Sequence, residues 1–104
     1  DKFKNIFKLI NENMQDNAFR KYVVSSNAFR GGFLISMYEV VALGLYYNYD
    51  NLSKITKKKL SKKVQSFWEN FELQKDPAYN WKGLNTTNRI QKTIPIGRAL
   101  FSDI

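Results

Sequence analysis

The chain has 104 residues, a net charge of +8 and a pI of about 9.8. This length predicts one domain, and a hydrophobic content of 43% with 15% aromatic residues predicts a folded core. The sequence contains no cysteine and no histidine, which excludes disulfides, thiolate metal sites, cysteine nucleophiles and histidine general bases. We therefore expect neither a metal nor a cofactor, and the lack of cysteine is compatible with a cytoplasmic location.

The high positive charge favours a polyanionic partner, which would be nucleic acid or an acidic membrane surface. A genome rich in lysine and asparagine codons would give the same charge without any such partner. The longest apolar stretch runs about 15 residues, short of the roughly 20 that a membrane-spanning helix needs, so we expect no membrane partner. The sequence begins with Asp1 and not with methionine. We therefore expect residues 1–104 to be a single helical module from a longer protein.

The first fourteen residues predict an amphipathic helix, because apolar residues recur there at spacings of three and four. Residues 18–22 follow as a short helical turn. The segment from Val23 to Gly32 is rich in serine, asparagine and glycine, and it predicts a loop with at most a brief extended piece at Val23 and Val24. Alternation of period two is absent over any useful length, so we expect no sheet.

The stretch from Phe33 to Tyr47 is apolar nearly all round and carries one charged residue, Glu39. Such a helix must be covered by other elements, so residues 33–48 predict a central helix around which the other segments pack. A carboxylate buried in it must be paired or neutral. We expect Glu39 to form a structural ion pair with one of three arginines, rather than to be catalytic. These arginines are Arg20, Arg30 and Arg98.

Residues 52–73 predict a helix with an apolar stripe on one face and six lysines on the other. The lysines lie near its N-terminal end and the acids Glu69 and Glu72 near its C-terminal end, the reverse of what the helix dipole favours. Lysines one turn apart, such as Lys58 and Lys62, can contact successive phosphates. The alternative is that this face is simply solvated.

The C-terminal third predicts a short helix over 77–82 and a helix from Thr86 to Lys92. Pro95 then predicts a break, with a restart capped by Thr93. Together these elements predict an all-α fold of about five helices around the central one. The residues that we expect to contact nucleic acid come from both basic segments. They are Lys57, Lys58, Lys62, Lys63, Arg89 and Lys92.

Gly31 and Gly32, which precede the central helix, suit a tight turn better than a phosphate site. Trp68 and Trp81 suit a core better than base stacking. No two acids stand at a spacing that indicates metal ligands or an acid–base pair, so we expect no catalytic residue in this chain.

Three segments also carry a resemblance to a known family. They are Phe7…Asp16-Asn17-Ala18-Phe19-Arg20-Lys21, Phe29-Arg30…Met37-Tyr38-Glu39-Val40 and Thr86…Ile94…Arg98. They resemble the C-terminal helical region of the ParB-like proteins exemplified by the GmrS half of GmrSD restriction systems. The resemblance implies bacterial defence against modified phage DNA, in a parent protein that is an NTP-dependent DNA endonuclease. It also implies that Phe19-Arg20, Glu39 and Arg98 are ties between helices.

The DGQQR-type motif of that family's N-terminal domain is absent here, and so is the histidine-containing nuclease motif of its partner domain. The resemblance therefore implies a non-catalytic module that supports the nuclease assembly and contacts DNA. The alternative is a protein–protein interaction module that docks on its own upstream domain or on a partner subunit without binding nucleic acid. The sequence leaves both open.

Overall fold

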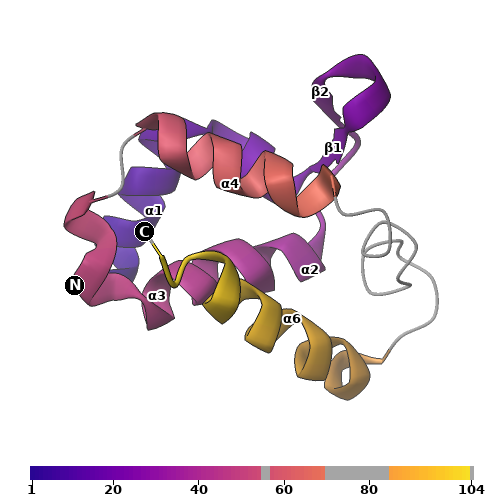
Figure 1. Ribbon diagram of the computed structural model, residues 1–104. Coiled ribbons are helices and arrows are strands. Elements are labelled where there is room, and N and C mark those ends of the chain that lie inside the picture. The colour runs from indigo at the N-terminus through magenta and orange to yellow at the C-terminus, as the bar shows by residue number, and fades with distance from the viewer. Residues whose placement is uncertain (55–56, 70–84, 104) are drawn as a thin grey trace.

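The computed structural model describes residues 1–54, 57–69 and 85–103, and these residues are mostly helical (Figure 1). This confirms the helical class that the sequence predicts, although a small two-stranded sheet is added and the helix count differs. The predicted helix over 77–82 lies outside the described residues. The helical segments in chain order are α1 (Lys2–Asn13), η1 (Gln15–Phe19), η2 (Val24–Ser26), α2 (Ile35–Tyr38), η3 (Glu39–Leu43), α3 (Gly44–Tyr47), η4 (Tyr49–Lys54), α4 (Lys57–Glu69) and α6 (Thr86–Leu100).

The helix α1 begins at Asp1, whose carboxylate accepts a hydrogen bond from the backbone N–H of Phe3 at 2.9 Å. This cap satisfies a donor that would otherwise have no partner at the helix start. Ile6 and Ile10 are buried in the core, whereas Phe3 and Phe7 on the same apolar stripe stay exposed. The predicted helix is therefore present, but only part of its stripe faces the core.

A β-hairpin stands where the sequence predicts a loop, so the prediction that no sheet forms is wrong. Strand β1 (Lys21–Val23) pairs antiparallel with β2 (Ala28–Arg30), and Tyr22 lies opposite Phe29. Each strand has three residues. Alternation over so short a segment does not stand out in a sequence. The turn between the strands is closed by Asn27 in the left-handed conformation, with a φ of 51°.

The central helix runs as one helical path through α2, η3 and α3, close to the predicted 33–48. Its middle portion, η3, is a π-helix, a rare form that widens the helix by one residue per turn. Met37, Val40, Val41 and Leu45 are fully buried. Other elements cover this helix: α1 packs against α3, and α6 crosses α2, η3 and α3, while α4 packs against α1 (Figure 1).

The predicted helix over 52–73 is present as α4, which begins at Lys57 after the 3-10 helix η4. Leu60, Val64, Phe67 and Trp68 form its buried stripe, as the spacing predicts. Residues 70–73 lie outside the described residues.

The predicted break at Pro95 is wrong, because α6 continues through Pro95 without interruption. A proline inside a helix costs one hydrogen bond and introduces a steric clash. The neighbours Thr93 and Gly97 are completely buried against the central helix, and this packing offsets the local cost. The helix begins at Asn85, whose side chain accepts a hydrogen bond from the N–H of Asn88 at 2.8 Å.

The crossing between α6 and the central helix depends on two glycines. A Cβ atom added at Gly97 would lie 2.3 Å from the carbonyl oxygen of Val40, and one at Gly44 would lie 2.5 Å from that of Gly97. The backbones therefore touch directly. Next to them, Nδ2 of Asn48 donates hydrogen bonds to the carbonyl oxygens of Gly44 at 2.9 Å and Arg98 at 3.0 Å.

We expect the substitution Gly97→Ala to lower the free energy of unfolding by about 1–3 kcal/mol, because the new methyl group must push two backbones apart. The matched control is Gly32→Ala, where an added Cβ meets nothing within 4 Å. Thermal unfolding of both variants by circular dichroism gives the comparison. Alanine is the better helix former by about 1 kcal/mol, so a stabilised Gly97→Ala variant would show that the crossing is not tight.

Candidate nucleic-acid interface

The buried acid Glu39 forms its ion pair with Arg89 of α6. The guanidinium Nε of Arg89 lies 2.9 Å from Oε1 of Glu39, and its Nη2 lies 2.9 Å from Oε2. The hydroxyl of Thr93 also donates to Oε1 at 2.9 Å. Arg89 and Thr93 stand one turn apart on α6, so both reach the same carboxylate. The contact is bidentate, which is the strongest geometry for such a pair.

A structural pair for Glu39 is therefore present, but the three arginines that the sequence offers as its partner are the wrong ones. Nε of Arg20 donates to the carbonyl of Gly31 at 2.8 Å. Nε of Arg30 donates to the hydroxyl of Ser26 at 3.2 Å. The guanidinium of Arg98 lies over the exposed ring of Tyr47, 4.3 Å from its centroid.

The correct partner was assigned to nucleic acid because Arg89 belongs to a basic segment without acids. The helix pattern gave a usable signal: with α6 unbroken at Pro95, Arg89, Thr93 and Gly97 follow one another every four residues on one face. The predicted restart at Thr93 breaks this register. Since its guanidinium is held by Glu39, which raises the pKa of Arg89, this arginine is not available as a primary DNA contact.

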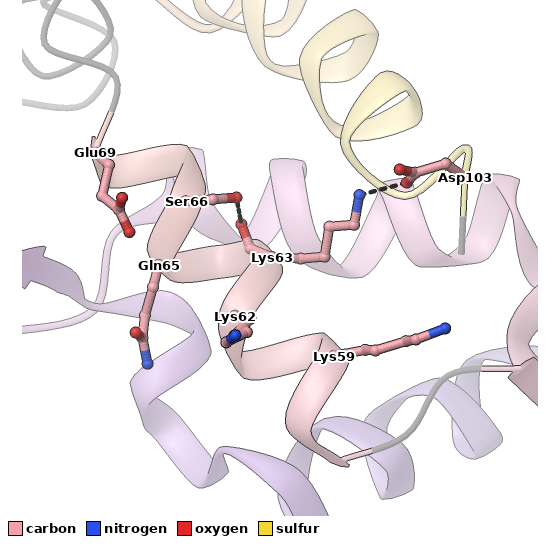
Figure 2. Close-up of a pocket in the computed structure, with 7 residues that line it drawn as sticks. All are labelled: Lys59, Lys62, Lys63, Gln65, Ser66, Glu69 and Asp103. Carbon is pink, nitrogen blue, oxygen red and sulfur yellow. Dashed lines mark hydrogen bonds and ion pairs between the residues drawn. The ribbon is translucent and has the colours of Figure 1, made fainter.

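The second basic feature is the lysine face of α4, which borders an open hollow of about 580 Å³ (Figure 2). Seven side chains line the hollow: Lys59, Lys62, Lys63, Gln65, Ser66, Glu69 and Asp103. Figure 2 shows Lys63 reaching towards Asp103, in the turn that follows α6, while Lys62 points away from it. Three of the seven side chains are cationic and two are anionic, so the hollow is mixed in charge.

Asp103 is a partner that the sequence analysis did not consider. Its carboxylate forms an ion pair with Nζ of Lys63, and the hydrogen bond from Lys63 lowers the pKa of Asp103. The carboxylate is exposed, so the pair adds little stability. It does reduce the net positive charge at Lys63. The exposed Lys62 is thus the better-placed phosphate contact of the two.

Of the remaining predicted contacts, Lys92 lies on a different helix from Lys62. Lys57 and Lys58 begin α4, and their side chains lie outside the described part of the structure. Lys92 is exposed on α6, and Figure 1 shows α6 and α4 on opposite sides of the central helix. The structure therefore separates the two predicted basic segments, and α4 alone carries a row of lysines.

An exposed aromatic surface is the feature that sequence reasoning missed. It consists of Phe3, Phe7, Phe33, Tyr38 and Tyr46. The rings of Phe3 and Tyr46 stack with centroids 4.5 Å apart, and Tyr38 contacts both Phe7 and Phe33. Phe33 is 50% exposed, and Phe3, Phe7 and Tyr46 are also classed among the exposed side chains. A helix stripe that is read as core in the sequence is thus divided between the core and this surface.

Comparison with protein-family models, with curated proteins and with solved structures gave no match. Among residues 1–54, 57–69 and 85–103, no helix is both long and apolar enough to cross a membrane. The same residues contain no group of three acids that could hold a metal ion.

We expect Arg89→Met to lower the free energy of unfolding by roughly 3 kcal/mol. This value is the lower limit of the usual cost of breaking a buried ion pair, because Arg89 is partly exposed. The loss arises because the carboxyl group of Glu39 stays buried in the core without its partner. The control is Arg98→Met, which removes an exposed arginine from the same helix. Chemical denaturation measures both. Replacing the pair together, as Glu39→Leu with Arg89→Met, should recover part of the loss, and a double variant as unstable as the sum of the single ones would contradict the pairing.

Proposed function

We propose that this chain is a non-catalytic helical module that contacts DNA through the lysine face of α4. We further propose that it belongs to a modified-DNA restriction or phage-defence protein similar to the GmrSD systems. The observation that carries the DNA contact is the run of lysines in the first half of α4, of which Lys59 and Lys62 are exposed. The assignment to that kind of system rests on the three segments of resemblance, together with the buried tie at Glu39.

The charge distribution on α4 supports a polyanionic partner. Five lysines occur between Lys57 and Lys63, and no acid lies in the first turn of the helix. Cations at a helix N-terminus are disfavoured by the helix dipole, so the arrangement does not serve the stability of the helix itself. Each lysine that contacts a phosphate releases counterions, and this gain supplies affinity without reading the base sequence.

In this proposal catalysis lies outside the chain. An upstream ParB-like domain would hydrolyse nucleotide, and a nuclease domain would cleave DNA. This module would bind the duplex and keep the assembly on it, in the cytoplasm. The role suits a fold in which a buried polar cluster joins two helices. Glu39, Arg89 and Thr93 satisfy each other across two helices, as a scaffold requires.

We expect the double variant Lys58→Gln, Lys62→Gln to bind duplex DNA more weakly than the wild type. The slope of log K against log salt should become shallower by about 2, one for each phosphate contact that is lost. Fluorescence anisotropy with a labelled duplex measures both the affinity and its salt dependence. The titrations would run from about 25 to about 200 mM NaCl, where phosphate contacts depend strongly on salt.

The control is Lys4→Gln with Lys8→Gln, which removes the same charge from the exposed side of α1. If the two double variants lose affinity equally, the effect is one of net charge and α4 is not the site. If the wild type shows no binding at low salt, the DNA contact itself is refuted.

The aromatic surface favours a second candidate function, in which the module docks on its upstream domain or on a partner subunit. Exposed contiguous apolar surface is uncommon on proteins that act alone, and aromatic side chains are enriched in the centres of interfaces. The exposed rings lie on α1, on α3 and in the segment that precedes α2, and none of them belongs to α4. The two functions can therefore coexist on one module.

If the aromatic surface is a docking site, the isolated chain should self-associate through it. We expect Phe33→Gln to reduce light scattering at high protein concentration, while Ile90→Gln, at a 39% exposed position on α6, should leave scattering unchanged. Equal scattering from both variants and the wild type would count against docking through these rings.

A further inference from the structure

The β-hairpin places two cations directly opposite each other. Lys21 of β1 pairs with Arg30 of β2, so their side chains leave the same face of the ribbon. The next pair, Tyr22 and Phe29, faces the other way, and its rings pack 4.9 Å apart with Tyr22 buried. One face of the hairpin is therefore fixed to the core, and the other presents two positive charges.

Like charges directly opposite on neighbouring strands destabilise a hairpin. Among the described residues, no carboxylate forms an ion pair with Lys21 or Arg30. Arg30 contacts only the hydroxyl of Ser26 through its Nε. The repulsion is thus not relieved within the part of the chain that the structure describes, and an external anion between the two side chains would relieve it.

The hairpin is held at its base and closed by a hydrogen bond near its tip, so its cations are positioned in advance. Arg20 donates from Nε to the carbonyl of Gly31, and the N–H of Leu34 donates to the carbonyl of Phe19 at 2.8 Å. At the other end, the hydroxyl of Tyr22 lies 3.2 Å from Oδ1 of Asn27. A binding element that is ordered before its ligand arrives loses less conformational entropy on binding.

The hairpin projects from the body beside the C-terminal end of α4 (Figure 1), and β1 contacts that helix. Its exposed turn residues are Val24, Ser25, Ser26 and Asn27. Only Val24 among them is apolar, so the tip is poorly suited to entering a lipid layer, whereas hydroxyl and amide groups suit phosphate oxygens. A two-stranded ribbon is also narrow enough to enter the major groove of a duplex.

We propose that the β-hairpin is a second phosphate-binding element for duplex nucleic acid, in which Lys21 and Arg30 clamp the backbone from one ribbon face. The proposal rests on the DNA contact proposed for α4 and extends it. The two elements adjoin through the contact between β1 and α4, so the lysine face and the ribbon face would grip one duplex at two places. The contact fixes the position of the duplex and does not read its sequence.

The test is the double variant Lys21→Gln, Arg30→Gln, which keeps both side chains long and polar. If the cations bind phosphate, duplex binding weakens and the log K against log salt slope becomes shallower by about 2. The melting temperature should stay at or above that of the wild type, because the cross-strand repulsion is removed. A merely structural role of these residues predicts the opposite stability change.

The control with the same charge change is again Lys4→Gln with Lys8→Gln, on the helix that starts at the opposite side of the view from the hairpin (Figure 1). If the hairpin variant and this control have the same affinity for DNA, the hairpin proposal is overturned. A loss of affinity in the α4 variant would then still support the α4 site. If the hairpin variant loses affinity and the α4 variant does not, the proposed contact at the hairpin is supported and the proposed contact at α4 is refuted. No binding by the wild type, or binding only to phosphatidylserine vesicles, overturns both.

Discussion

The structure depends on the pairing of one buried carboxylate with residues from the last helix. Glu39 opens the π-helical segment η3, where the central helix is wider than an ordinary α-helix. Arg89 and Thr93 bind its two oxygens, and one turn further along α6 the backbone at Gly97 meets that of Val40. The polar pair and the close crossing specify each other, because the glycines allow the approach that the short Thr93 hydroxyl needs. The same packing keeps α6 helical through Pro95.

The sequence predicted best where one strong pattern dominates. Fifteen residues with a single charge indicated the central helix, and the spacing of Leu60, Val64 and Trp68 indicated the buried face of α4. It predicted poorly where structure arises from contacts between distant residues. Arg89 could not be matched to Glu39 without the orientation of α6, and a local rule for Pro95 hid that orientation. The three-residue strands of the hairpin were too short to show a period, and apolar spacing alone could not tell the exposed Phe3 from the buried Ile6.

The charge of the molecule is arranged over separate surfaces. The lysines of α4 and the hairpin cations lie on neighbouring elements, whereas Lys92 lies on the helix at the far side of the central one. The exposed rings occupy α1, α3 and the segment before α2. Net charge alone therefore gives a misleading impression of a uniformly basic protein, because Glu39 and Asp103 each engage one of the cations that the sequence offers. What is left for a polyanion is a smaller set of side chains than a count of lysines and arginines suggests.

The attachment of α6 to residues about fifty positions earlier also bears on how the chain reaches its native state. Arg89 and Thr93 donate to Glu39, and the carbonyl of Arg98 accepts from Asn48, so these hydrogen bonds span 50 to 54 residues. During synthesis the central helix leaves the ribosome before α6 does. The delay is the time that the ribosome needs to add the residues between them. Until α6 arrives, the carboxylate of Glu39 lies in an apolar helix without its arginine, and Gly44 leaves a groove in its surface. Completion of the core is therefore a late, long-range event, of the kind that slows folding relative to a helical protein built from local contacts.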